Sequence, residues 1–380
     1  MKRPRYSVLI PDAESGHALI VARCLAAAGA RICALGPDQQ TALRFSTRVD
    51  YYRRQKTRNR RDAFSVQFIR DQMRKCGANV FLPVDEPAHE FAIDHQDELR
   101  SFANLPPLAT AEAYRTATNK DQLAAFLISA GLPTPFTVAI GPVTPQTFPP
   151  PGLDFPLLAK PVRGDGGRGI VALHSAEQAA SFLSDGHMAR FGRYVLQRYI
   201  SGFDIDISAL CVDGEIIAHT IQRAVVSRAR SFAAAAGLEF LDAPDLLQTA
   251  RAMFKKLRFS GIAHVDARYD EASREFKIIE VNARYWGSLA ASLKAGVNFP
   301  DIACRRALGE CAPTTDYAHM RFIDSVSYIK RLLSNPRGNS TTSFGIRETD
   351  AVHIMCDPVA EGANILMRWN KPFESTRPRR

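Results

Sequence analysis

The 380-residue sequence, of which 46% is hydrophobic, is long enough to bury a sizeable core and to divide into two or three domains. No apolar run approaches the roughly 18 residues that a transmembrane helix needs, and the N-terminal apolar segment is too short for a signal peptide. Seven scattered cysteines form no C-x-x-C pair, so we interpret them as reduced thiols rather than zinc ligands or disulfides. Together these features predict a cytoplasmic protein without a membrane span.

The net charge of +10 is concentrated in two places, residues 44–61 and the tail TRPRR. Such clusters are typical either of a surface for RNA or an acidic partner, or of a solvated loop and a free chain end. No nucleic-acid-binding module accompanies them, which favours the solvated interpretation and argues against a nucleic-acid partner.

Strand-like and helix-like patterns alternate through the first 110 residues. They predict strands at residues 6–10, 31–35 and 79–82 and helices at residues 15–29 and 62–75, the first of them capped by Ser15. Alternation of this kind indicates a Rossmann-like domain, a parallel sheet with helices on both faces. The first turn, PDAESGH, lacks G-x-G-x-x-G and so does not indicate a dinucleotide site.

Three acids follow strands of this predicted sheet, namely Asp12, Asp85 and Glu86. Ligands of open α/β sheets gather at the carboxyl ends of the strands, which makes these acids candidate neighbours of a substrate. Capping of the helix that follows is an equally good explanation of Asp85 and Glu86.

A linker-like stretch, NLPPLATAEAY, leads to a helical pattern that begins at Lys120. A cation at a helix start opposes the helix dipole, so helix stability does not explain this lysine. A phosphate contact would explain it, and so would a solvated side chain. The five prolines of residues 141–152 predict a connection.

A glycine-rich stretch, FPLLAKPVRGDGGRGIVAL, comes next. Lys160 ends an apolar strand, and the loop of residues 163–169 begins with Arg163 and carries four glycines, Gly164, Gly166, Gly167 and Gly169. Glycines let backbone N–H groups approach an anion closely, so a flexible hairpin of this kind can close over phosphates. The loop is not a Walker A motif, and taken alone it is a weak signal, because most glycine-rich turns are only turns.

Residues 194–226 alternate apolar and polar side chains, with Asp213-Gly214 as a hairpin turn, and predict an antiparallel sheet in a different domain. A helix is expected at residues 243–257. Three arginines between them could grip a substrate carboxylate by bidentate pairing or form an exposed basic loop: Arg223, Arg228 and Arg230.

The most informative stretch is FKIIEVNARYWGS, residues 276–288, together with GIAHVDARYD before it. Both are strand-like, and each places an acid, Glu280 or Asp266, among apolar neighbours, where a carboxylate is costly unless a cation holds it. Asn282 lies on the same face as Glu280 by strand alternation. If the two strands pair as a hairpin, these three side chains converge as oxygen ligands suited to magnesium. Ion pairs with Arg268 or Arg284 are the structural alternative.

The chain beyond this centre is less informative. Residues 285–288, Tyr-Trp-Gly-Ser, could line an acceptor pocket, with Gly287 opening a helix, or Trp286 could simply pack beneath that helix. Residues 321–334 predict a strand and a short helix. AVHIMCDP and ANILMRW predict two further strands.

The order of these features resembles the ATP-grasp superfamily over about residues 1–310, and within it the carbamoyl-phosphate-synthase-like and D-alanine-ligase-like carboxylate–amine ligases. The resemblance rests on the two lysines, the glycine loop, the segment Gln-x-Tyr-Ile-x-Gly-x-Asp and the spacing of Asp266 from Glu-x-Asn. It implies an N-terminal Rossmann-like domain of residues 1–110 and an ATP-grasp domain of residues 111–310, in which two α+β subdomains clamp ATP and the lid spans about residues 130–200. Residues 311–380 would form a C-terminal extension.

The resemblance also implies roles for single residues. Lys120 and Lys160 match nucleotide-binding lysines, and residues 163–169 match the mobile loop that covers the triphosphate. The hinge that holds adenine matches Gln197, Tyr199 and Ile200, although the family often has an acid at the first position. Asp204 matches the ribose-binding acid, and Asp266, Glu280 and Asn282 match the magnesium ligands. Arg284, with Lys160 and His264, matches groups near the transferred phosphate.

The implied activity is ATP-dependent ligation of a carboxylate to an amine with Mg²⁺, or Mn²⁺ in its place, releasing ADP and phosphate. ATP activates the carboxylate because oxide is too poor a leaving group for direct attack by an amine. A phosphotransferase on the same fold and a non-catalytic nucleotide- or RNA-binding module remain as alternatives. Many relatives are homodimers, but the sequence does not indicate an interface.

Overall fold

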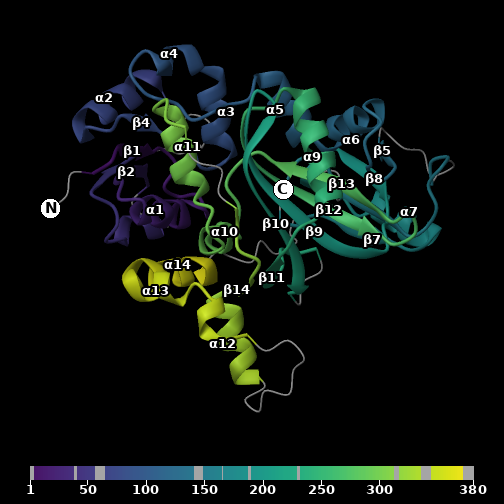
Figure 1. Ribbon diagram of the computed structural model, residues 1–380. Helices are drawn as coiled ribbons and strands as arrows, with labels where there is room; N and C mark the ends of the chain where they lie inside the picture. The colour runs from purple at the N-terminus through teal and green to yellow at the C-terminus, as the bar shows by residue number, and fades with distance from the viewer. Residues whose placement is uncertain are drawn as a thin grey trace.

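The structure is a computed structural model that describes residues 4–37, 41–55, 65–140, 149–164, 166–186, 190–228, 232–311, 316–334 and 344–370. Figure 1 shows a parallel sheet with its helices in purple and blue, antiparallel sheets in teal and green beside it, and yellow C-terminal helices below. No helix in these ranges combines the length and apolar character needed to cross a bilayer. All seven cysteines are free.

The first sheet is parallel, with the strand order β3-β2-β1-β4. Its strands are β1 (Ser7–Ile10), β2 (Arg31–Gly36), β3 (Tyr51–Arg54) and β4 (Val80–Phe81). Its helices are α1 (Ala18–Ala27), the 3-10 helix η1 (Ala42–Phe45), α2 (Val66–Cys76), α3 (Glu86–Asp94) and α4 (Gln96–Arg100). Val8 and Ile10 pack in one core with α1, whereas Leu9 packs in another with α2, so helices cover both faces. The predicted Rossmann-like architecture is confirmed.

Three local predictions in this region are wrong. Helix α1 begins at Ala18 after His17, because the Ser15 hydroxyl accepts from the His17 amide in a tight turn instead of capping the helix. Part of the basic stretch is edge strand β3 rather than loop, since parallel pairing with β2 satisfies its backbone; residues 56–61 lie outside the described ranges. The end of the linker-like stretch is helix α5 (Ala111–Thr118), which Thr110 caps.

Two antiparallel sheets follow. One has the order β5-β8-β6-β7 and consists of β5 (Thr137–Ala139), β6 (Leu157–Pro161), β7 (Val171–Leu173) and β8 (Tyr194–Arg198), with helix α7 (Ala176–Ser184). It has a hydrophobic core of its own and falls in the predicted lid region. The predicted domain boundaries themselves remain predictions. The proline-rich residues 141–148 lie outside the described ranges.

The other sheet has six strands in the order β13-β12-β9-β10-β11-β14. They are β9 (Gly202–Val212), β10 (Glu215–Val226), β11 (Gly237–Phe240), β12 (Gly261–Asp270), β13 (Glu275–Asn282) and β14 (Arg321–Ile323). The helices that accompany it are α5, α6 (Lys120–Ser129), α9 (Pro244–Leu257), α10 (Leu289–Lys294) and α11 (Phe299–Ala307). As predicted, Asp213 and Gly214 form the β9–β10 turn, both at positive φ.

Side-chain alternation gives this sheet an apolar and a polar face. On β9, Ile205, Ile207 and Ala209 are at most 1% exposed and pack in one core with α5, α6 and α9. Asp204 and Asp206 alternate with them and therefore lie on the opposite face. The polar face of the six-stranded sheet carries the predicted site residues Asp266, Glu280 and Asn282.

The C-terminal part adds β14, helix α12 (Ser325–Ser334), the 3-10 helix η4 (Ile346–Glu348), α13 (Ala351–Cys356) and α14 (Pro358–Asn370). The strand and short helix expected at residues 321–334 are confirmed. The two strands expected at AVHIMCDP and ANILMRW are wrong, because both segments are helical. Short apolar runs do not distinguish helix from strand, and here packing against the first domain selects helix: Ala360 of α14 is buried in the α1 core.

Candidate functional site

Two rows of polar side chains cross the polar face of the six-stranded sheet. The strand registers place Glu280, Asp266, Asp206 and Gln222 opposite one another across β13, β12, β9 and β10. The neighbouring row consists of Asn282, His264, Ser208 and Thr220. The predicted hairpin is therefore confirmed, and it sets the three predicted metal ligands at one end of a larger polar surface.

Glu280 lies next to both the first lysine and the glycine loop. Its Oε1 is 3.2 Å from Lys120 Nζ, and the same ammonium group donates to the carbonyl of Gly164 at 3.0 Å. Lys120 is only 6% exposed, so it is not a solvated lysine. The structure thus brings together one carboxylate, one lysine and the loop that the sequence placed far apart.

Lys160 is buried at the end of β6, and its Nζ donates to Gln197 Oε1 at 2.6 Å. Burial lowers the pKa of Lys160 to about 8, and the positive charge of Lys120 acts in the same direction, whereas Glu280 opposes the shift. An anion between the two lysines would offset the unfavourable free energy of burying the Lys160 charge beside Lys120. Gln197 also donates to Thr137, which fixes its amide beside the lysine.

The glycine loop joins β6 and β7, which are paired antiparallel. Gly164 is open, with no atom within 4 Å of a Cβ built there, whereas a Cβ on Gly167 would lie 2.1 Å from the carbonyl oxygen of Phe232. Gly166, Gly167 and Gly169 all have positive φ. Arg163 at the loop start donates to Asn119 and lies 3.5 Å from Glu90. Asp165 is outside the described residues.

We expect Gly167→Ala to loosen this loop. Its φ of +71° disfavours any side chain, and the added Cβ displaces the loop from Phe232, at a cost of about 1–3 kcal/mol in this conformation. Gly287→Ala is the matched control, because that glycine has open space. Thermal unfolding and amide exchange of the loop measure the effect; equal stability and exchange in the two variants would contradict it.

The expected adenine and ribose residues gather around Arg268. This arginine pairs with Asp204, donates to the carbonyls of Ile200 and Gly202, and lies 5.8 Å from the centroid of the exposed Tyr199 ring. Arg268 therefore pairs with Asp204, whereas the sequence had made it a candidate partner of Asp266. One arginine thus holds the strand start at the edge of the predicted nucleotide region.

Arg284 follows β13, the strand that carries Glu280 and Asn282, and connects it to the first domain. Its Nη2 donates to Asn282 Oδ1 at 3.3 Å, its Nη1 donates to His17 Nε2 at 3.0 Å, and its Nε is 3.6 Å from Asp85. Asp85 also caps α3, which confirms the capping explanation considered for it. Buried Asp12 accepts from the amides of Val84 and Asp85 and thereby shapes this turn.

His264 belongs to the second row and lies close to Asp266 of the first row. Its ring stacks on Trp286 with centroids 5.4 Å apart, its Nδ1 is 2.9 Å from Ser208 Oγ, and its Nε2 is 3.4 Å from Asp266 Oδ1. Burial, with Arg284 and His17 nearby, lowers the pKa of His264 to about 3, so the imidazole is neutral at neutral pH. Trp286 is buried in the α1 core, as its packing interpretation requires. The helix after it, α10, begins at Leu289 rather than Gly287.

The arginines considered for a substrate carboxylate already have partners. Arg223 pairs with Glu239 at 2.5 Å, and Arg228 pairs with Asp324 at 2.8 Å. Arg230 lies outside the described residues. The structure does not bring the two described arginines to the metal ligands.

Four polar members of the two rows were missed: Asp206, Gln222, Ser208 and Thr220. The signal for Asp206 was present in DIDIS, because Asp204, Asp206 and Ser208 alternate with apolar residues and must share one face. Gln222 depends on the β9–β10 register, which periodicity does not determine.

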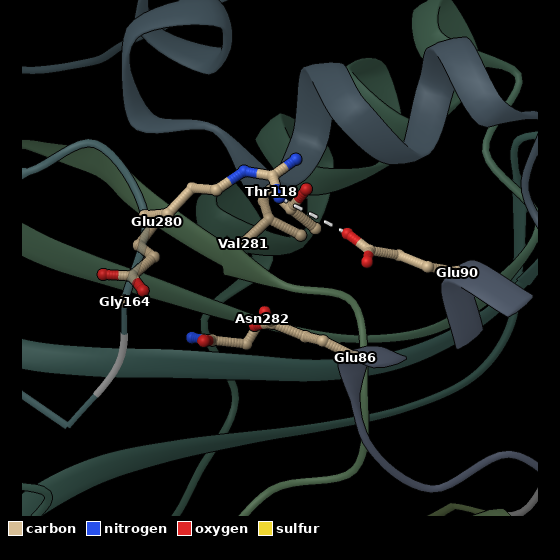
Figure 2. A pocket seen from close by; sticks show the side chains of 8 residues that line it. Glu86, Glu90, Thr118, Gly164, Glu280, Val281 and Asn282 are labelled. Carbon is tan, nitrogen blue, oxygen red and sulfur yellow. Dashed lines mark hydrogen bonds and ion pairs between the residues drawn. The ribbon is translucent and has the colours of Figure 1, made fainter. Parts of the chain in front are cut away.

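A pocket opens in front of Glu280 and Asn282 (Figure 2). Its lining comes from the first domain, the glycine loop and β13: Glu86, Glu90, Thr118, Arg163, Gly164, Glu280, Val281 and Asn282. In Figure 2 the carboxylates of Glu86 and Glu90 face the pocket from the side opposite Glu280. The site therefore lies between the Rossmann-like domain and the antiparallel sheets.

Comparison with known proteins gives one family match. The family described as ATP-grasp in the biosynthetic pathway with Ter operon matches residues 190–332. This range contains the six-stranded sheet and all three predicted metal ligands. No curated protein sequence matches the chain.

Solved structures match over most of the chain. The biotin carboxylase domain dimer of Hydrogenobacter thermophilus 2-oxoglutarate carboxylase, in complex with MgADP, ADP and bicarbonate, has a TM-score of 0.64 and 18% identity, covering 83% of this chain and 72% of its own. The L-amino acid ligase of Bacillus licheniformis has 0.62 and 17%, covering 82% and 78%. The N5-carboxyaminoimidazole synthetase of Staphylococcus aureus, complexed with ADP, has 0.66 and 14%, covering 88% and 86%.

Proposed function

We propose that this chain, which belongs to the ATP-grasp superfamily, is an ATP-dependent ligase that activates a carboxylate as an acyl phosphate and couples it to an amine. The products would be the coupled compound, ADP and phosphate. One observation carries the proposal: Lys120 bridges Glu280 and Gly164, so a cation, an acid and the glycine loop converge on one point.

The donor set suits magnesium, with Mn²⁺ as the alternative ion. Asp266 and Glu280 are directly opposed across β12 and β13, and Asn282 adds an amide oxygen, which together make a hard oxygen site. Burial and the neighbouring Glu280 carboxylate raise the pKa of Asp266, which is the electrostatic strain that a bound cation removes. Bound there, the ion would neutralise charge on the phosphate oxygens.

The nucleotide would lie between the sheet of β5–β8 and the polar face. Lys120 and Lys160 would hold phosphates, together with Gly164 and its loop. Gln197, Tyr199 and Ile200 would hold adenine, and Asp204 would hold the ribose once Arg268 yields it. Two of the structural neighbours are in complex with ADP, which supports a nucleotide ligand for this chain.

The reaction has two balanced steps. A carboxylate oxygen attacks the γ-phosphorus and ADP leaves; the amine nitrogen then attacks the acyl carbon, and phosphate leaves as the amine loses a proton. Lys160 and Arg284 would neutralise charge on the transferred group. The glycine loop would keep water from the acyl phosphate between the two steps.

The structural neighbours suggest which class of substrate to test, but they do not identify the substrate. One is described as an L-amino acid ligase and another is in complex with bicarbonate, so small carboxylates and small amines are the first to test. The biotin carboxylase neighbour, which is in complex with bicarbonate, is also described as a domain dimer, and this supports testing for a homodimer.

A coupled ADP-release screen of amino acids and other small carboxylates against amines tests the function. ADP formation that requires both a carboxylate and an amine supports the ligase. ADP formation with one substrate and a stable phosphorylated product by mass spectrometry would instead identify a phosphotransferase. Absence of ATP turnover across the panel, with ATP bound, would favour a binding module.

A further inference from the structure

We propose that Asp206, His264 and Asp266 form a second cation site, which includes a nitrogen ligand and is suited to a first-row transition-metal ion of the Zn²⁺ class. The proposal goes beyond the ligase function, because it does not depend on nucleotide or substrate. It shares one residue, Asp266, with the proposed magnesium set.

The three ligand atoms have the spacing of a metal site. Each residue offers one atom, and all three atoms lie within 4.8 Å of one another. His264 Nε2 is 3.4 Å from Asp266 Oδ1 and 3.8 Å from Asp206 Oδ2. Bonds of about 2.0–2.1 Å in a tetrahedron place ligand atoms about 3.4 Å apart, so little movement is needed to enclose an ion.

The imidazole is already oriented for ligation. The Trp286 ring lies almost parallel to it, at 13°, and fully buried Ser208 holds Nδ1 at 2.9 Å. With the proton on Nδ1, donated to Ser208, the Nε2 lone pair points at the two carboxylates. A metal-bound histidine characteristically has its other nitrogen held in this way.

A buried amide gives independent support. Gln222 lies opposite Asp206 in the strand register and is 0% exposed. Its Nε2 donates to Ser288 at 2.9 Å, but its Oε1 has no hydrogen-bond partner within the described part of the chain. The Gln222 side chain also hydrogen-bonds Asp206, which places this amide beside the three ligands. Its unpaired oxygen costs about 1–3 kcal/mol in the interior, and a water bound to an ion in the site would satisfy it.

The charges also balance. Two carboxylates and a neutral imidazole carry a charge of −2, which one divalent ion cancels. The nitrogen ligand separates this site from the all-oxygen set, since imidazole favours zinc and its neighbours over magnesium.

Cobalt titration of the metal-stripped protein tests the site without ATP. We expect one Co²⁺ per chain with the visible ligand-field absorption of a four- or five-coordinate ion, displaced by Zn²⁺ but not by excess Mg²⁺. Asp206→Asn and His264→Gln should each weaken binding more than about 100-fold, and Ser208→Ala about 10- to 100-fold. Circular dichroism confirms that each variant folds.

Two matched variants separate this site from its neighbours. Glu280→Gln removes an acid of the proposed magnesium set, and Asp204→Asn removes the acid two residues before Asp206 on the same face; both should keep the cobalt spectrum. An octahedral cobalt spectrum that Mg²⁺ abolishes would overturn the proposal. A cobalt spectrum that survives in both Asp206→Asn and His264→Gln would also overturn it. So would its loss in Glu280→Gln. Because the readout is spectroscopic, these results are independent of whether ADP is formed.

Discussion

Glu280→Gln should reduce ADP formation about 1000-fold while leaving the fold intact. The substitution keeps the size of the side chain but removes the charge that faces Lys120 at 3.2 Å and Asp266 across the hairpin. The proposed magnesium ion would lose its central ligand, and Lys120 would lose its ionic partner. Steady-state ADP release with the best substrate pair, alongside circular dichroism, measures the effect.

Glu275→Gln is the control for this experiment. Glu275 lies on the same strand but is exposed and pairs with Lys277, so its removal should leave the rate within about twofold. A Glu280→Gln enzyme with wild-type ADP formation would refute the proposed site. Equal losses of ADP formation in the two variants would indicate a general effect of negative charge on β13 rather than the loss of a metal ligand.

Breaking the ion pair between Arg23 and Glu361 should be the most damaging change for stability. It joins α1 to α14, its side chains are 7% and 11% exposed, and the atoms are 2.9 Å apart. Removing one partner of a buried pair leaves the other charge uncompensated, so Glu361→Leu or Arg23→Met alone should cost about 3–5 kcal/mol. Chemical denaturation measures the change in the free energy of unfolding.

The double variant decides whether this cost belongs to the pair. Two apolar side chains of similar volume often replace a buried ion pair at little cost, so Arg23→Met with Glu361→Leu should recover most of the loss. Glu310→Gln, which removes the exposed partner of Arg305, should cost less than about 1 kcal/mol. Additive losses in the double variant, or a loss for Glu310→Gln as large as that of the single buried variants, would contradict this explanation.

Local sequence was sufficient to predict structure where both the residue pattern and the interaction that causes it lie within one short segment. Strand alternation placed Asp266, Glu280 and Asn282 on one face, and the structure has them opposed or adjacent on β12 and β13. The same reasoning fails for residues 351–369, whose apolar runs suit either periodicity. There the buried Ala360 and the ion pair of Glu361 to α1 stabilise a helix, and both depend on residues more than 300 positions away.

The arginines show the same limit. Bidentate chemistry made Arg223 and Arg228 candidates for a substrate carboxylate, but Glu239 and Asp324 already pair with them. Glu239 comes from β11, which pairs with β10, and Asp324 directly follows β14, which pairs with β11. Charge in a sequence thus indicates what a side chain can bind, whereas the neighbouring strand determines what it does bind.

The sequence by itself determined the alternation of helices and strands in the first domain, the strand pattern that puts Glu280 and Asn282 on one face, and the resemblance to the ATP-grasp superfamily. These depend on side-chain order within short segments, where periodicity and backbone geometry act directly. Only the tertiary structure decided that Lys120 meets Glu280 and that Asp206, His264 and Gln222 continue the polar rows. Strand order and register are set by packing of the whole sheet against its helices, and that free energy is not encoded in any single segment.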